Sequence, residues 1–104
     1  MAKFIFIYIT NPTKAEARKI AKHLVEKKLI ACANIYSNIN SIYPWKGKIA
    51  EGKETILIAK TTEKNYNKVK EEVEKIHSYT IPCIAKLPAD FNDKYAEWLK
   101  SNLE

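Results

Sequence analysis

The chain opens with a short apolar run, and a polar break and then a helical pattern follow it. Residues 4–10 (FIFIYIT) are apolar on both faces and rich in β-branched and aromatic side chains, which indicates a central strand. Thr13 and Glu16 have the spacing of a capping box, which predicts the start of a helix. Beyond them, apolar residues recur every three or four positions, as on one helix face; they are Ala17, Ile20, Ala21, Leu24 and Val25.

The middle of the chain predicts two long strands joined by a tight turn. The first begins at residues 29–36 (LIACANIY) and continues, after a polar kink at residues 37–38, to Trp45. Gly47 indicates the turn because glycine takes positive φ without steric cost. The return strand covers residues 49–61. Together the two strands form a long bent hairpin.

This hairpin is longer than the core of one small domain requires, and Gly52 is expected to mark a bulge or bend in its return strand. An isolated hairpin arm would leave unpaired backbone groups along its edges, which proteins usually cover. The apolar residues make up 46% of the chain, more than one small core obviously needs. We therefore expect an oligomer in which neighbouring subunits cover the arm.

The last part of the chain predicts a helix, a strand and a short terminal helix. Thr62 is expected to cap the second helix, whose inward stripe is Tyr66, Val69, Val73 and Ile76. Residues 77–82 form the exit loop, and residues 83–87 form a fourth strand that Pro88 ends. The spacing of Tyr95, Trp98 and Leu99 fits a short amphipathic C-terminal helix.

The resulting order is β-α-β-β-α-β followed by a terminal helix, within one domain over residues 1–104. This is the ferredoxin-like α+β pattern, an antiparallel sheet with two helices on one face. Because many unrelated activities share this fold, function has to be argued from particular side chains.

Composition and motifs argue against several classes of protein. The net charge of +6 comes mostly from lysines interleaved with glutamates, which is typical of a solvated helix surface rather than of a nucleic-acid interface. An RNA-recognition sheet would need glycine and aromatic residues in the strand over residues 54–61, and there are none. An acylphosphatase-like enzyme would need an arginine in a phosphate loop, whereas Arg18, the sole arginine, lies mid-helix. No nucleophile–base pattern is evident, so we do not expect an enzyme.

The two cysteines and the lengths of the apolar runs bear on location. No apolar run approaches the ~20 residues of a membrane span. Cys32 and Cys83 do not form a Cys-x-x-Cys motif, which leaves free thiols in a reducing compartment as the default interpretation. We expect a cytoplasmic protein without membrane association.

Several segments, in order along nearly the whole chain, resemble the CutA family of divalent-cation-tolerance proteins. They are residues 31–35 (ACANI), 41–43 (SIY), 45–49 (WKGKI), Glu54 with Leu57 and residues 60–61, the loop His77-x-Tyr79-x-x-Pro82, and Tyr95 with Trp98 and Leu99. The resemblance implies a very stable cytoplasmic homotrimer, built by pairing the long hairpins between neighbours. It also implies a role in divalent-cation tolerance, with copper binding in some members, no required cofactor and no family-wide catalytic activity. The trimer of this family resembles the PII signalling proteins, so a sensing or scaffolding role is the alternative.

The candidate metal ligands are Cys32, His77 and Cys83, because thiolate and imidazole are the groups that copper selects. Their spacing supplies no local chelate, so Cu²⁺ or another divalent cation would need a site assembled in space or between subunits. The favoured interpretation of both thiols is structural, with Cys32 buried and Cys83 buried in the fourth strand. His23 is interpreted as a surface residue.

A second set of candidates surrounds a cleft expected between subunits. His77 and Tyr79 lie on a helix-to-strand loop, where functional residues concentrate. With Tyr43 and Trp45 as aromatic walls and Lys60 as a fixed positive charge, they would bind a small anion or a protein tail. The alternative is that His77 caps the helix and Tyr79 packs at the trimer interface.

Two hairpin carboxylates, Glu51 and Glu54, could serve as an acid–base pair or bind a hard metal ion. Lysines flank them at Lys48 and Lys53. Exposed ion pairs with these lysines are therefore the favoured interpretation.

Overall fold

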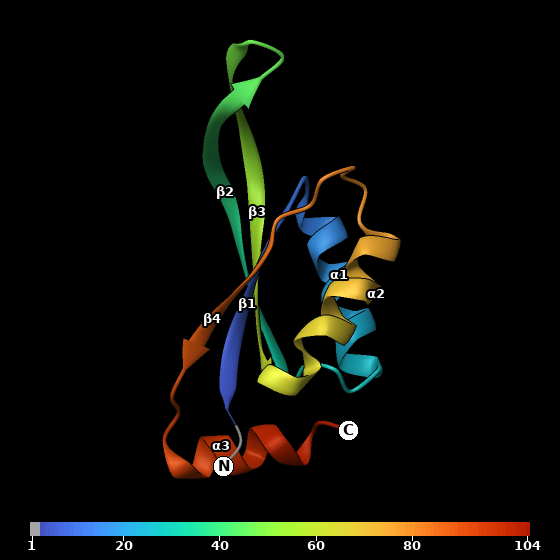
Figure 1. Cartoon of the computed structure of the whole chain (residues 1–104), viewed down its shortest axis with the longest axis vertical. Coiled ribbons are helices and arrows are strands. Elements are labelled where there is room, and N and C mark those ends of the chain that lie inside the picture. Colours follow the sequence, from blue (N-terminus) through green and yellow to red (C-terminus); the bar gives the residue numbers. More distant parts are fainter. Residues whose placement is uncertain (1–2) are drawn as a thin grey trace.

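The computed structural model describes residues 3–104, so the first two residues of the predicted domain lie outside the described part. The elements are β1 (Phe4–Asn11), α1 (Lys14–Glu26), β2 (Cys32–Trp45), β3 (Lys48–Thr62), a 3₁₀ turn η1 (Glu63–Asn65), α2 (Tyr66–Ile76), β4 (Ile84–Ala89) and α3 (Asp93–Ser101). The sheet is antiparallel with the order β2-β3-β1-β4. Helices α1 and α2 lie side by side on one face of it (Figure 1). The predicted ferredoxin-like α+β fold is confirmed.

The core lies between β1 and the two helices. Alternate residues of β1 are buried, and Ile7 and Ile9 are fully covered. They belong to one cluster with Ile20 and Leu24 of α1 and Val69 of α2. The periodicity predicted the buried faces of the two helices, except that Val25, at the edge of the α1 stripe, is 44% exposed. It did not distinguish the two faces of β1, because apolar residues occupy both.

The start of α1 follows the predicted cap only in part. The Glu16 N–H donates to Thr13 Oγ1 at 3.1 Å, which is the expected N-cap bond. The Glu16 carboxylate does not complete a capping box, because it accepts hydrogen bonds from Ser78 on the loop after α2.

The predicted cap of the second helix is wrong. The turn η1 lies between Thr62 and α2, and Thr62 makes no side-chain capping bond. Its hydroxyl is buried, and among the described residues it has no hydrogen-bond partner. The chain leaves β3 in the direction of the 3₁₀ turn, so this hydroxyl does not reach the first N–H groups of α2.

The hairpin is long and bent, as predicted, and the kink expected at residues 37–38 is confirmed. The register shifts between Tyr36 and Ile39, and Asn38 takes φ +63°. Gly52 instead pairs regularly with Ser41, so the bulge predicted there is wrong. The polar pair at residues 37–38 causes the bend because asparagine tolerates the left-handed region better than most residues.

The tip of the hairpin projects beyond the rest of the molecule (Figure 1). Strand β1 ends opposite Thr55, so the part of β3 before that residue pairs with β2 alone. Lys46 and Gly47 form the two-residue connection with φ of +51° and +78°. Both angles are positive, as in a type I′ turn, which matches the twist of the two strands. The arm gives the molecule extents of 46 × 23 × 21 Å.

Two further boundaries differ from the prediction. Strand β4 begins at Ile84, which leaves Cys83 exposed on the preceding loop rather than buried in the strand. The strand also continues through Pro88 to Ala89. Proline is tolerated there because β4 is an edge strand and pairs only with β1.

Candidate functional site

The loop after α2 is held by a buried imidazole. The His77 side chain has no solvent exposure. Its Nε2 lies 2.7 Å from the Thr10 carbonyl oxygen, and its Nδ1 lies 3.0 Å from the Tyr79 backbone nitrogen. A carbonyl only accepts and an N–H only donates, so Nε2 carries the proton and Nδ1 accepts. Both ring nitrogens of His77 are therefore engaged within the chain.

A carboxylate ties the same loop to the first turn of α1. Glu16 Oε2 accepts hydrogen bonds from the Ser78 N–H at 3.1 Å and from the Ser78 hydroxyl at 3.0 Å. It also lies 3.5 Å from His77 Nδ1. The negative charge sits near the N-terminus of α1, where the helix dipole favours it.

Tyr79 connects this loop to the hairpin. Its hydroxyl donates to Glu54 Oε2 at 2.7 Å, and its ring lies 4.8 Å from the His77 ring, centroid to centroid. Burial, then the hydrogen bond to Glu54, raise the pKa of Tyr79 well above its ordinary value, with Tyr43 adding a smaller contribution. The phenol therefore stays protonated and acts as a hydrogen-bond donor rather than as a base.

The structure brings together some of the predicted cleft residues and separates others. His77 and Tyr79 are in contact, and Tyr43 is near enough to affect the ionisation of Tyr79. Trp45 lies at the hairpin tip, 58% exposed, with the Lys46 ammonium 5.8 Å from its ring centroid. Within a single chain, therefore, only His77, Tyr79 and Tyr43 of the predicted cleft residues lie near one another.

Lys60 lies at the other end of the hairpin. It is ten positions along β3 from Ala50, the partner of Tyr43, a separation of about 33 Å at the rise of a strand residue. Its ammonium lies 3.3 Å from the Tyr95 hydroxyl and 5.2 Å from the Tyr95 ring centroid. A cleft that combined Lys60 with Tyr43 would need residues from more than one subunit.

The three predicted metal ligands do not meet within one chain. Cys32 is half-buried at the start of β2, opposite Lys60. Cys83 is exposed beside β4, at the opposite edge of the sheet. Among residues 3–104, no group of three or more His, Cys, Asp or Glu side chains could hold a metal ion. His77 offers no free nitrogen, and the predicted burial of Cys83 is wrong.

Large apolar side chains remain exposed along the hairpin and on the sheet face opposite α1 and α2. We call the sheet face opposite the two helices the open face. The strand pairing places Tyr8, Ile58, Tyr36 and Leu87 on it. Tyr36 is 57% and Leu87 49% exposed. On the projecting arm the exposed apolar residues are Ile42, Tyr43, Trp45 and Ile49.

Comparison with known proteins identifies the family. Residues 5–102 match the description "CutA1 divalent ion tolerance protein". The chain belongs to this family. The divalent-cation tolerance protein CutA of Thermus thermophilus is 45% identical over 97 residues, which cover 92% of this chain and 94% of that protein. The CutA protein of Archaeoglobus fulgidus is 44% identical over 100 residues, covering 95% and 97%.

Solved structures of the family have the same fold. The crystal structure of the divalent ion tolerance protein CutA1 from Ehrlichia chaffeensis matches with a TM-score of 0.94 at 37% identity, covering 98% of this chain and 96% of that one. The Thermus thermophilus Cut A1 structure matches with a TM-score of 0.89 at 43% identity over the full length of both chains. The projecting hairpin therefore belongs to the shared CutA1 architecture. No helix within residues 3–104 has the length and apolar character to cross a membrane.

Reasoning from sequence missed the two carboxylates that complete the loop network of this CutA1-family chain. Glu16 was expected only to cap α1, and its contact with Ser78 spans 62 positions. Glu54 was expected to pair with Glu51 or with neighbouring lysines. Among the described residues neither Glu51 nor Glu54 forms an ion pair, so the favoured prediction for them is wrong. No local signal links Glu54 to Tyr79, because only the packing of loop on hairpin joins them.

Proposed function

We propose that this chain acts in divalent-cation tolerance as a cytoplasmic homotrimer that binds Cu²⁺ or another soft divalent ion, without catalytic activity. The observation that carries the proposal is the match of residues 5–102 to the divalent ion tolerance family, and the exposed thiol of Cys83 supplies an accessible soft ligand. The described part of one chain holds no group of three or more candidate ligands. A site with a complete ligand set would therefore have to include ligands from more than one subunit.

The open face and the hairpin arm support assembly. Ile42 is 68% and Ile49 83% exposed, and both lie on an arm whose outer backbone edges are unpaired within the chain. Contact with a neighbour would remove this apolar surface from water and pair the strand edges at the same time. The proposal of three subunits rests on the resemblance of this family to the PII-like trimers.

The choice of metal follows from the available ligands. A thiolate selects soft or borderline ions such as copper over magnesium or calcium. Cys83 is accessible, whereas the His77 ring is buried and already bonded at both nitrogens. Cys83 is therefore the principal ligand in this proposal. Cys32 is the second thiol, and it would bind the same metal ion as Cys83 only if the two cysteines came from different subunits.

Light scattering and calorimetry test the two parts separately. We expect a mass three times the 12.0 kDa of the chain, and a micromolar solution of monomers would contradict the assembly. Anaerobic titration with Cu²⁺, after reduction of the thiols and removal of the reductant, should show saturable binding that Cys83→Ser removes. His23→Gln is the matched control, because it removes a surface imidazole that this proposal does not use. Equal heats for Cys83→Ser and the unchanged protein would contradict the metal site.

The alternative is a PII-like signalling trimer that binds a small anion or a protein tail beside Lys60. The observation that favours it is that Lys60 contacts the Tyr95 phenol and ring, while no carboxylate of the described residues lies within 4.0 Å of it. A metabolite that raises the melting temperature of the protein but not of Lys60→Ala would support this function over metal binding.

A further inference from the structure

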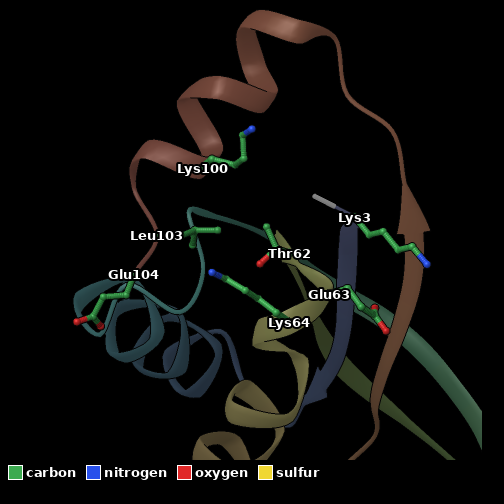
Figure 2. Close-up of a pocket in the computed structure, with 7 residues that line it drawn as sticks. All are labelled: Lys3, Thr62, Glu63, Lys64, Lys100, Leu103 and Glu104. Atoms are coloured by element: carbon green, nitrogen blue, oxygen red, sulfur yellow. The ribbon is translucent and has the colours of Figure 1, made fainter. Parts of the chain in front are cut away.

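A cavity of about 500 Å³ lies between α3 and the end of the sheet where β1 begins and β3 ends (Figure 2). It is separate from the His77 loop and from both cysteines. Three lysines line it, namely Lys3, Lys64 and Lys100. Figure 2 shows Lys100 projecting from α3 on one side of Thr62 and Lys64 running along the other side.

The three lysines of this cavity form no ion pair with another described residue. No carboxylate of the described residues lies within 4.0 Å of the Lys3, Lys64 or Lys100 ammonium groups. Of the two acidic residues in the wall, Glu63 is already paired with Lys86 of β4. The carboxylate of the other, Glu104, points away from Lys100 in Figure 2.

The floor of the cavity contains a polar group that lacks a partner. Thr62 is 5% exposed, and its Oγ1 makes no hydrogen bond with any described residue. A buried hydroxyl without a partner is costly, and most such groups in proteins are satisfied by protein, water or ligand. The hydroxyl is drawn on the side toward Lys64 in Figure 2, and an acceptor oxygen in the cavity would supply the partner that this hydroxyl lacks.

We propose that this cavity binds a small metabolite through an anionic phosphoryl or carboxylate group. Its oxygen atoms would accept hydrogen bonds from the Thr62 hydroxyl and from the Lys64 and Lys100 ammonium groups. The volume lies in the range of small-molecule sites and exceeds what a single halide ion needs. Two lysine charges favour a ligand with at least two negative charges. This proposal does not depend on the trimer or on metal binding.

Calorimetric titration with pyrophosphate and, separately, with citrate tests the proposal, and sodium chloride at equal ionic strength controls for screening. Saturable binding of pyrophosphate alone identifies a phosphoryl ligand, and that of citrate alone identifies a carboxylate ligand. We expect Lys64→Gln and Lys100→Gln each to weaken binding by about tenfold, since each removes a charge-assisted hydrogen bond. Lys94→Gln is the matched control, because Lys94 is an exposed lysine of α3 outside the cavity wall.

Thr62→Val separates binding from folding. It removes only the unpartnered hydroxyl, so the melting temperature of the free protein should stay the same or rise while the affinity for the anion falls by about tenfold. The proposal is overturned if neither anion binds saturably at millimolar concentration. It is equally overturned if Lys94→Gln weakens binding as much as Lys64→Gln and Lys100→Gln, because binding would then report only the overall charge.

Discussion

The Tyr79 hydroxyl donates a 2.7 Å hydrogen bond to the Glu54 carboxylate, and this bond joins the loop after α2 to the base of the projecting hairpin. The same loop is bonded to the end of β1 through His77 and to α1 through Glu16. The loop therefore fixes the direction of the hairpin relative to the two helices. An arm that pairs with neighbouring subunits needs such a fixed direction, because an ordered arm loses less conformational entropy on association.

Tyr79→Phe tests the bond to Glu54. It leaves a half-buried carboxylate without its phenol partner, so we expect the free energy of unfolding to fall by about 1–2 kcal/mol. Urea denaturation measures this value. Tyr36→Phe is the control, since the Tyr36 hydroxyl makes no hydrogen bond within the described residues and its ring is 57% exposed. An equal loss in both variants would mean that the Glu54 contact adds nothing to stability.

Acid should destabilise the protein through Glu72. Hydrogen bonds from His23 and then Lys27 lower the pKa of Glu72 from 4.5 to about 2. A carboxyl group whose pKa is lower in the folded state contributes stability that is full above pH 4.5 and is lost as the pH falls toward 2. Glu72→Gln should therefore flatten the stability curve in this window.

Denaturant unfolding between pH 7 and pH 2 measures that slope. Glu71→Gln is the matched control, because Glu71 is an exposed neighbour without an ion pair among the described residues. Added salt should reduce the difference, since the charges on this helix surface are partly screened. If the free energy of unfolding fell equally steeply below pH 4.5 for Glu72→Gln and for the unchanged protein, the proposed role of this carboxylate would be contradicted.

The two glycines of the hairpin should respond differently to the same substitution. A Cβ at either position meets no atom within 4 Å, so only the backbone decides the outcome. Gly47→Ala should destabilise the protein by about 1–2 kcal/mol because an L side chain is strained at φ +78°. Gly52→Ala should change stability by about 0.5 kcal/mol or less, as at an ordinary strand position. Thermal unfolding of the two variants makes the comparison, and a larger loss at Gly52 would contradict it.

A charge introduced on the exposed apolar surface of the hairpin arm should weaken assembly without affecting folding. Ile42 is 68% exposed, so Ile42→Lys should leave the secondary structure seen by circular dichroism unchanged. In an interface the added charge would be buried without a partner, which is strongly unfavourable. Light scattering should therefore show a smaller particle. Ser37→Lys, at the polar bend of the same strand, is the control, and an unchanged mass for Ile42→Lys would exclude the arm tip from the interface.

Local patterns predicted the elements of this chain well where one physical cause acts alone. The three-to-four spacing in α1 identified Ile20 and Leu24 as core residues, because burial on one side of a helix imposes its period on the sequence. In β1 apolar residues occupy both faces, so the sequence did not show that Ile7 lies on the buried one. The turn at Gly47 was also predictable, since positive φ restricts residue choice. The kink at residues 37–38 was predictable from its polar residues, since Asn38 tolerates positive φ, whereas the second irregularity expected at Gly52 is absent because Gly52 pairs regularly with Ser41.

The candidate site was only partly predictable. The loop residues His77 and Tyr79 were identified from the sequence, but their partners were not. Thr10 is 67 positions from His77, and Glu54 is 25 positions from Tyr79. Hydrogen bonds over such separations depend on how the helices and the hairpin pack, so the sequence carries no periodic signal for them.

By itself, the sequence determined the order of strands and helices, the buried face of α1, and the tight turn at the hairpin tip, since each follows from local backbone preference or from one-sided burial. Only the tertiary structure decided that His77 is fully bonded inside the chain, that Cys83 is exposed, and that Lys60 lies far from Tyr43. These properties depend on distances between segments that are remote in sequence, and such distances exist only once the sheet register and the packing of the loops are set.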